Sequence, residues 1–264
     1  MSLIGFKVIF GILFHFFLNL VFKRMMFFND NSSFSKHKKL AVDNKSTLLT
    51  GGLSLLVLLF IFFDGNYYLK FFCCLIFIIG IISDLNLLNS PAKRLFLQTI
   101  VISFFIFHFK NNIYFTNIYF LDLILEYKII SYLFTIYCFL ILINGTNFID
   151  GLNGLVIGYY ILSLGMLLIF ILNKDISYDY SLLTILLIIL VINFSFNLFG
   201  KNFLGDSGSY LIAFIVGYLL VDFYKSYSEI SALFIVTLLW YPAFENLFSI
   251  IRKKIDKTDP SKPD

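Results

Sequence analysis

Charged side chains are scarce in this chain of 264 residues, where Asp, Glu, Lys and Arg together make up 14% against about 25% in ordinary globular proteins. Hydrophobic residues reach 59%, more than the about 45–50% found in water-soluble domains. This hydrophobicity excludes a disordered chain, and the net charge of +4 is too small for a nucleic-acid-binding module. The composition therefore predicts an integral membrane protein with no nucleic-acid partner.

Cysteine is also rare. Cys73, Cys74 and Cys138 all lie inside apolar runs, which leaves neither a disulfide framework nor a metal-ligand spacing. We expect them to be small buried side chains. The first apolar run contains Lys7 and reaches Phe22 without a small-residue cleavage site, so we expect a membrane span there and not a removed signal peptide.

A membrane-crossing helix needs about 20 mostly apolar residues. Nine stretches approach that length, and they are 3–22, 48–63, 68–83, 93–109, 129–146, 152–172, 180–199, 208–224 and 230–250. A tenth, 118–125, contains Asp122 and is too short to span, so we expect it to be an interfacial segment. The sequence predicts one all-helical, polytopic membrane domain over residues 1–264, with about nine spans and no soluble module.

Basic residues are divided unevenly between the two sets of loops. If the 23–47 loop faces the cytoplasm, 14 of the 20 lysines and arginines lie on that face. The positive-inside rule therefore favours this orientation. It places Asp84, Asp150 and Asp206 on the cytoplasmic face.

These three aspartates stand where an apolar stretch meets a loop. Asp84 ends the third stretch, Asp150 lies between the fifth and sixth, and Asp206 opens the eighth. Acidic groups at membrane depth are costly and usually functional. Hard cations such as Mg²⁺ take carboxylate, amide and phosphate oxygens, and the neighbouring glycines leave backbone N–H groups open to an anion. The cluster predicts a divalent-metal and phosphate site.

Several of the nearby polar residues also have a structural interpretation. Lys93, Arg94 and Lys201 could contact phosphate, or they could serve only as anchors at the membrane surface. Asp206 and Ser209 have the spacing of a helix N-cap and its partner.

Polar residues within the apolar stretches are open to the same two interpretations. Asn193 and Asn197 are four residues apart on one helical face, which suits hydrogen bonds between helices. Glu245 lies inside the ninth stretch, where a partner on a neighbouring helix would satisfy it. Both interpretations stay open at the level of sequence.

Five segments, in order, resemble glycosyltransferase family 4, the polyprenyl-phosphate N-acetylhexosamine-1-phosphate transferases, whose relatives include the phospho-N-acetylmuramoyl-pentapeptide transferase. Residues 144–155 match the family's Asn-x-x-Asn-x-x-Asp-Gly-x-Asp-Gly-Leu segment, and residues 197–209 match Asn-x-x-x-x-x-Phe-x-Gly-Asp-x-Gly-Ser. A third segment is Thr50-Gly51-Gly52. A fourth consists of residues 79–84, followed by Ser90-Pro91-Ala92-Lys93-Arg94 and Gln98. The fifth consists of Pro242, Glu245 and Arg252 with the 260–264 tail.

Members of this family move a sugar 1-phosphate from a UDP-sugar onto a polyprenyl phosphate and release UMP. The resemblance implies an N-acetylhexosamine UDP-sugar as donor, undecaprenyl phosphate as acceptor, and Mg²⁺, with Mn²⁺ as a substitute. It also implies a bacterial plasma membrane protein with its active site facing the cytoplasm, acting in the first membrane step of a cell-envelope glycan pathway.

The resemblance also implies roles for individual residues. Asp206 would be the principal Mg²⁺ ligand, with Asp150 beside it, and Asp84 would assist the acceptor phosphate. Asn144 and Asn147 would hold the nucleotide diphosphate together with Asp150. The remaining expected substrate contacts are Asn153, Lys93, Arg94, Asn197 and Glu245.

Three departures from the family pattern stand out. The first acid of the family's aspartate pair is Ser83, and the second aspartate of the Asp-Gly-x-Asp-Gly element is Asn153. The family's His-x-His segment and last span would follow Asp264, and His15, His37 and His108 do not stand in that position. A phosphate monoester with a second pKa of about 6 is already largely deprotonated near neutral pH, so the acceptor needs positioning more than a strong base.

Two alternatives to the transferase stay open. A transporter would line a solute path with intramembrane acids, but such acids lie near the midplane between related halves, whereas these lie at one face and no internal repeat is evident. A catalytically inactive relative would bind lipid phosphate without turnover, in keeping with Ser83. A homo-oligomer is compatible with either alternative and with the transferase.

Overall fold

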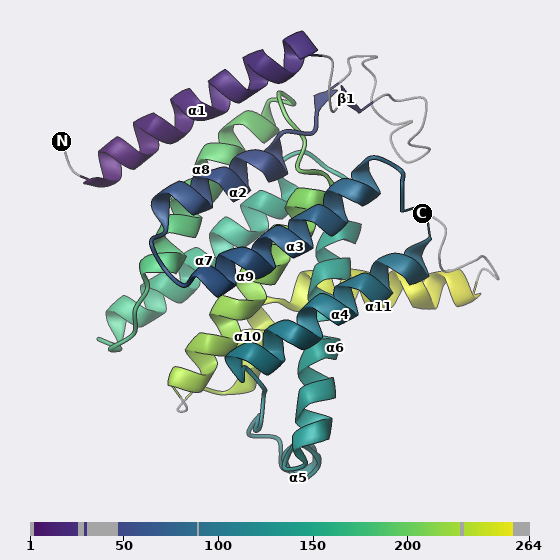
Figure 1. Cartoon of the computed structure of the whole chain (residues 1–264). Coiled ribbons are helices and arrows are strands. Elements are labelled where there is room, and N and C mark those ends of the chain that lie inside the picture. Colours follow the sequence, from purple (N-terminus) through teal and green to yellow (C-terminus); the bar gives the residue numbers. More distant parts are fainter. Residues whose placement is uncertain (1–2, 26–28, 31–46, 89, 228–229, 256–264) are drawn as a thin grey trace.

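The computed structural model describes residues 3–25, 29–30, 47–88, 90–227 and 230–255, which form a bundle of helices (Figure 1). Apart from one antiparallel pair of two-residue strands, β1 (Asn29–Asp30) and β2 (Thr47–Leu48), these residues lie in helices and their connections. The expected all-helical class is confirmed. The helices are α1 (Leu3–Met25), α2 (Gly51–Phe62), α3 (Tyr67–Asp84), α4 (Pro91–Phe109), α5 (Tyr119–Leu125), α6 (Lys128–Ile149), α7 (Leu155–Asn173), α8 (Ser181–Leu198), α9 (Gly205–Ser226), α10 (Ala232–Leu238) and α11 (Trp240–Ile255).

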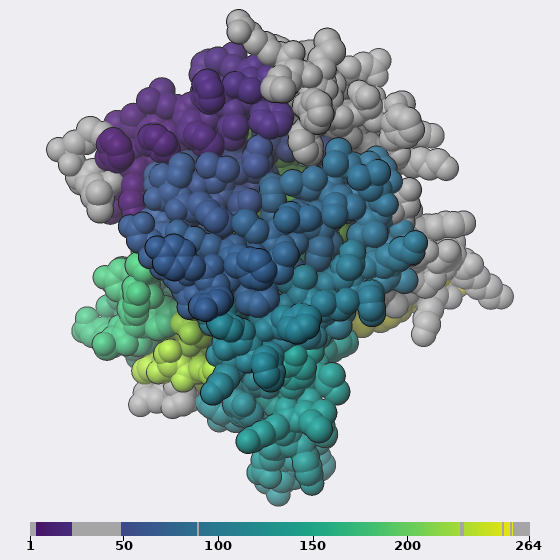
Figure 2. Space-filling model, viewed as in Figure 1, coloured from purple at the N-terminus to yellow at the C-terminus, as the bar shows by residue number. Residues whose placement is uncertain are grey.

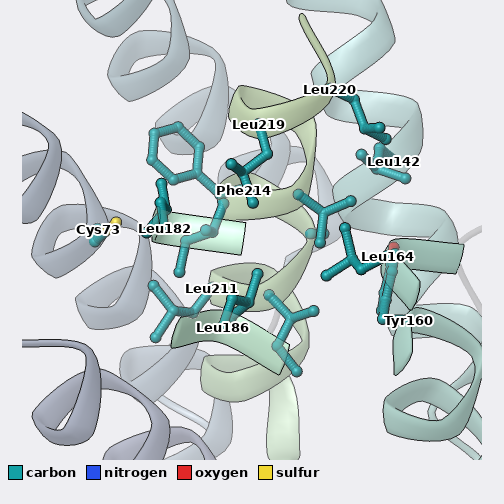
Figure 3. Close-up of a cluster of buried hydrophobic side chains, with 14 of the residues drawn as sticks. Cys73, Leu142, Tyr160, Leu164, Leu182, Leu186, Leu211, Phe214, Leu219 and Leu220 are labelled. Carbon is teal, nitrogen blue, oxygen red and sulfur yellow. The ribbon is translucent and has the colours of Figure 1, made fainter. Parts of the chain in front are cut away.

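Helix α9 is the centre of the bundle, and α2, α3 and α6 pack against it. All but two of residues 207–224 are buried, as expected for a helix that is apolar on every side. Figure 3 shows Leu211, Phe214 and Leu219 of α9 among apolar side chains of the neighbouring helices. The N-terminus of α9 is thus held by helices on several sides.

Two glycines let α2 and α3 approach the first turn of α9. A Cβ on Gly52 would lie 2.6 Å from the backbone nitrogen of Gly208, and a Cβ on Gly80 would overlap the backbone of Ser207. Small residues at crossings are typical of membrane bundles because they let helix backbones pack closely. The C-terminal end of α3 therefore lies directly against the start of α9.

The number of spans is lower than the nine expected. Within the part of the chain that the structure describes, seven helices are long and apolar enough to cross a membrane, or eight if α10 and α11 form one broken span. Helix α2 has 12 residues, or about 18 Å at 1.5 Å per residue, which is shorter than the about 30 Å hydrocarbon core. The expected ninth span is interrupted, because α10 and α11 meet at 70°.

The expectation for the 118–125 stretch is confirmed, and that for the cysteines holds for Cys73 alone. The 118–125 stretch contains the seven-residue α5, too short to span. Cys73, Cys74 and Cys138 are free, but only Cys73 is fully buried, and the other two are half-buried.

Helix α1 lies along one edge of the bundle. It packs against α2 and α8, and in Figure 2 its purple surface forms that edge, while α5 projects at the far end. The face of α1 that points away from the bundle is apolar and exposed, with side chains that suit contact with lipid: Ile4, Phe6, Ile9, Ile12, Leu13, Phe16, Phe17 and Leu20.

Candidate active site

Asp84 closes the N-terminus of α9 from the neighbouring helix α3. Its Oδ1 accepts the backbone N–H of Asp206 at 2.8 Å, and its Oδ2 accepts that of Ser207 at 3.0 Å. The first N–H groups of a helix lack partners within the helix, and a negative charge there is also favoured by the helix dipole. Gly205, at φ +70°, makes the approach feasible, since a Cβ there would lie 2.9 Å from Asp84 Oδ2.

The hydrogen bonds made by the Asp206 carboxylate converge on one oxygen, Oδ2. Ser83 Oγ donates to it at 2.5 Å, and Arg94 Nη1 lies 3.1 Å from it. The same Arg94 nitrogen is 3.1 Å from Ser83 Oγ, so the three side chains form a closed triangle. The Tyr210 hydroxyl reaches Oδ2 from one turn further along α9, at 3.5 Å. Helices α3, α4 and α9 are thereby joined at one carboxylate.

The charges in this triangle are largely shielded from water. Only 25% of the Arg94 side chain and 26% of the Asp206 side chain are exposed. Ion pairs in such surroundings interact more strongly than pairs at an open surface. Arg94 therefore has a specific partner and does more than anchor α4 at the membrane surface.

Helix α6 brings two expected residues to this assembly. Asn147 Oδ1 accepts a hydrogen bond from Ser209 Oγ at 3.1 Å, which ties α6 to the first turn of α9. Asn144 Nδ2 donates to Gln98 Oε1 at 3.0 Å, which ties α6 to α4. These amides hold the helices around Asp206, and their contact with a nucleotide stays a prediction.

Asp150 stands at the C-cap of α6, three residues after Asn147, and is half-buried. An acidic group at a helix C-terminus faces the negative end of the helix dipole, which costs about 0.3–1 kcal/mol at surface positions. The dipole of α6 therefore does not favour an aspartate at this position. Its placement is compatible with the expected role toward metal or diphosphate, which stays a prediction.

Asn197 shapes the loop in front of α9. Its Oδ1 accepts the backbone N–H of Gly154 at 2.6 Å, and its Nδ2 donates to the Asn202 carbonyl at 2.9 Å. The side chain is buried, and both ends of its amide bond to backbone. Exposed Asn153 reaches the same loop, because a Cβ on Gly200 would lie 3.5 Å from its Nδ2. Contact of Asn197 or Asn153 with substrate stays a prediction.

Three other polar residues lie around this centre. Asn193 Oδ1 accepts a hydrogen bond from Ser54 Oγ at 2.6 Å, so the structural interpretation of Asn193 is confirmed. Lys93 is exposed on α4, and Glu245 is half-buried on α11, which packs against α6. Among the residues that the structure describes, neither side chain forms a hydrogen bond or ion pair with Asp206.

The Asp206 carboxylate is compatible with a Mg²⁺ ion that is shared with phosphate, and this role stays a prediction. No group of three His, Cys, Asp or Glu side chains close enough to hold a metal occurs among the residues that the structure describes. Mg²⁺ usually takes one or two carboxylates and completes its shell with water and substrate phosphate. Since the bonds of Asp206 fall on Oδ2, its Oδ1 is the oxygen available to a cation in this part of the chain.

Comparison with known proteins identifies the family of this chain. The family model for glycosyl transferase family 4 matches residues 66–224, a stretch that contains Asp84, Asp150 and Asp206. The chain belongs to glycosyl transferase family 4. The first and last of the five recognised segments lie outside the matched residues, and their resemblance stays a prediction.

This family member also resembles a curated bacterial protein. Over 124 residues it is 32% identical to the probable undecaprenyl-phosphate N-acetylglucosaminyl 1-phosphate transferase of Bacillus subtilis (strain 168). The aligned stretch is 46% of this chain but only 34% of the relative. The similarity therefore covers less than half of this chain and about a third of the relative's length.

Sequence reasoning on this family 4 member missed two contacts at Asp206. In the sequence Ser83 only stands in place of the family's first acid, yet in the structure it bridges Arg94 and Asp206. Tyr210 also contacts Asp206, and its spacing of four residues puts both on one helical face. The Tyr210 contact had a signal in the sequence; the Ser83 bridge depends on how α3, α4 and α9 meet.

Proposed function

We propose that this protein is a membrane phosphotransferase that moves a sugar 1-phosphate from a UDP-sugar to undecaprenyl phosphate. The observation that carries the proposal is the Asp206 carboxylate, held by Ser83 and Arg94 at the N-terminus of α9, in a chain of family 4. The name of the Bacillus subtilis relative supports the undecaprenyl phosphate acceptor and an N-acetylglucosaminyl 1-phosphate group.

In the proposed reaction, an oxygen of the lipid phosphate attacks the sugar-bearing phosphorus of the UDP-sugar. The bond from that phosphorus to the bridging oxygen breaks, and UMP leaves with the bridging oxygen and its electron pair. A bound Mg²⁺ would supply charge neutralisation between the two phosphate groups. The acceptor needs no separate base where its phosphate is already ionised, which is consistent with Ser83 in place of an acid.

The residues around Asp206 have separate tasks in this proposal. Asp206 Oδ1 would hold the cation, while Asp84 keeps the first turn of α9 at a fixed orientation by binding its N–H groups. Arg94 can form two parallel hydrogen bonds with a phosphate, and it lies close enough to Asp206 to contact a phosphate bound there. Asp150, Asn144 and Asn147 would contact the diphosphate from the end of α6.

We place the site at the cytoplasmic face of a bacterial plasma membrane, in the first membrane step of a cell-envelope glycan pathway. The excess of lysine and arginine on one set of loops supports this orientation. The contact between Asp84 at the end of α3 and the start of α9 also supports a site near one membrane face. A transporter would place its acids near the midplane, so this position favours the transferase.

The decisive experiment is an assay of UMP release by the purified protein with undecaprenyl phosphate, Mg²⁺ and a panel of UDP-sugars. We expect release with at least one sugar, and we expect Asp206→Asn to lower kcat by at least about 100-fold, because it weakens charge stabilisation at the transferring phosphorus. Asp64→Asn is the matched control, since Asp64 is exposed in the α2–α3 connection and should leave the rate unchanged.

Three results would count against the proposal. Folded protein that releases no UMP from any UDP-sugar in the panel would contradict the transferase, and Mg²⁺-dependent binding of UDP-sugar without release would favour the inactive, phosphate-binding alternative. Full activity of Asp206→Asn would remove Asp206 from the site.

A further inference from the structure

Helix α1 carries one polar face in an otherwise apolar sequence. Lys7, Gly11, His15 and Asn19 follow one another at intervals of four residues, which places them along one side of the helix. This side faces the bundle: Gly11 and His15 are buried, and a Cβ on Gly11 would lie 2.5 Å from Ile192 Cδ1. The polar face of α1 is therefore the face that packs on the bundle.

The two ends of this face are hydrogen-bonded to α2 and the residue before it. Lys7 Nζ donates to the Phe62 carbonyl at 3.1 Å, and Asn19 Oδ1 accepts from Thr50 Oγ1 at 2.6 Å. Phe62 and Thr50 stand at opposite ends of α2, so these bonds hold α1 alongside it. They account for docking of the helix without any contribution from His15.

His15 makes a different contact, with the 199–204 loop that leads into α9. Its Nε2 lies 2.8 Å from Asn202 Nδ2, and its ring stacks on Phe196 with 4.1 Å between centroids. Because an amide nitrogen only donates, the ring nitrogen is the acceptor. Both side chains are almost completely buried, with 0% of His15 and 1% of Asn202 exposed.

Stability of the core does not explain this pair. His15 Nδ1 and Asn202 Oδ1 are both buried without a hydrogen-bond partner among the described residues. Leaving a buried polar atom unpaired is unfavourable, so two apolar side chains of similar size would pack here at lower cost. Buried polar pairs that cost stability can instead specify a single register, as a lone asparagine does in coiled coils.

The loop that His15 contacts is fixed at three consecutive points. The Asn202 side chain bonds to His15, the Asn202 carbonyl accepts from Asn197 Nδ2 at 2.9 Å, and the Phe203 carbonyl accepts from the Gly51 N–H at 3.0 Å. Asp206 follows three residues after Phe203. Of these three contacts, the one with His15 comes from α1, whereas the other two come from Asn197 of α8 and Gly51 of α2.

We propose that His15 is a positioning residue for Asp206: through Asn202 it fixes the loop before α9 and so the direction in which the Asp206 carboxylate points. This proposal rests on the proposed function for its effect on rate. Its structural part, the constraint of the 199–204 loop by α1, stands independently of the reaction.

The test compares His15→Leu, His15→Gln and Lys7→Met in the full-length protein. Since small misplacement of reacting groups costs up to about 100-fold in rate, we expect His15→Leu to lower kcat by at least about tenfold with little change in KM for the UDP-sugar. His15→Gln keeps a group that can bond to Asn202, and it should recover most of the lost rate. Lys7→Met removes another bond on the same face of α1 and should leave kcat unchanged.

Hydrogen–deuterium exchange of the 199–207 segment provides a readout that does not depend on activity. We expect faster exchange there in His15→Leu, recovery in His15→Gln, and no change in Lys7→Met. Asn202→Ser removes the hydrogen-bond partner of His15 and should give the same exchange rate and kcat as His15→Leu. This variant tests the proposal if His15→Leu does not fold.

The outcomes separate this proposal from the proposed function. If the unmodified protein releases no UMP, the function fails, and the exchange experiment still tests the constraint by His15. If the unmodified protein is active while the His15 and Asn202 variants exchange and react normally, the positioning role is wrong. Equal effects of Lys7→Met and His15→Leu would also overturn it, because docking of α1 as a whole would then explain the loss.

Discussion

At the scale of single residues, the most informative feature is the division of work between two neighbouring aspartates. Both carboxylate oxygens of Asp84 accept hydrogen bonds from backbone N–H groups of α9. In Asp206, a single oxygen accepts hydrogen bonds from Ser83 and Arg94. The sequence places both acids at span–loop junctions but does not distinguish these tasks. The difference arises because the backbone N–H groups at the start of α9 point toward α3.

Asp84→Asn should therefore destabilise the protein even without substrate. An asparagine offers one acceptor oxygen, and its NH₂ group would face a second backbone N–H that then lacks a partner. An unsatisfied buried donor costs about 1–3 kcal/mol, so we expect a lower midpoint of thermal unfolding in detergent. Asp64→Asn, at an exposed position, should unfold at the same temperature as the unmodified protein; an equal midpoint for Asp84→Asn would contradict the capping role.

At the scale of helices, close approach through glycine decides which elements meet at the site. Gly52 and Gly80 bring α2 and α3 against α9 at the turn that follows Asp206. The sequence shows these glycines inside apolar stretches, where their contacts cannot be read because the partner lies more than 100 residues away. The lengths of most helices, in contrast, follow from their apolar runs.

Gly80→Ala tests this arrangement directly. The added methyl group would overlap the backbone of Ser207, so α3 and α9 must separate and the hydrogen bonds of Asp84 must lengthen. Overpacking of this kind costs about 1–3 kcal/mol, and we expect lower thermal stability together with slower UMP release.

Gly165→Ala is the matched control for this substitution. A Cβ on Gly165 meets nothing within 4 Å, and replacing a mid-helix glycine by alanine favours the helix by about 0.5–1 kcal/mol. Stability and rate should therefore be unchanged or slightly higher. Equal losses in both variants would mean that close packing of α3 on α9 is not what Gly80 provides.

At the scale of the whole molecule, the orientation in the membrane is the property on which the proposed function depends. The positive-inside rule places Lys201 on the cytoplasmic side and the α7–α8 connection, with Ser177, on the other side. Both residues are exposed, so each can carry a reporter cysteine.

We expect a membrane-impermeant maleimide added to intact cells to label Ser177→Cys and not Lys201→Cys, in a background where the three native cysteines are alanine. Disruption of the membrane should make Lys201→Cys reactive as well, which controls for its accessibility. Labelling of Lys201→Cys in intact cells would place the site on the outer face and contradict a cytoplasmic donor.

The sequence by itself determined that this is an all-helical membrane protein and that its acids stand at span–loop junctions, because apolar run length and charge placement are local properties. It also carried the family resemblance that the match to residues 66–224 confirms. It did not determine that α2 is only 12 residues long or that α10 and α11 are bent by 70°, since an apolar run does not reveal where a helix breaks.

Only the tertiary structure decided how the polar residues are combined. Asp84 on the N–H groups of α9, Ser83 between Arg94 and Asp206, and His15 on Asn202 each join residues that are far apart in sequence, by up to 187 positions. Such contacts depend on which helices pack together and at what register. Helix pairing and register depend on close approach at glycines and on hydrogen-bond partners for buried polar groups. Neither can be read from one segment alone.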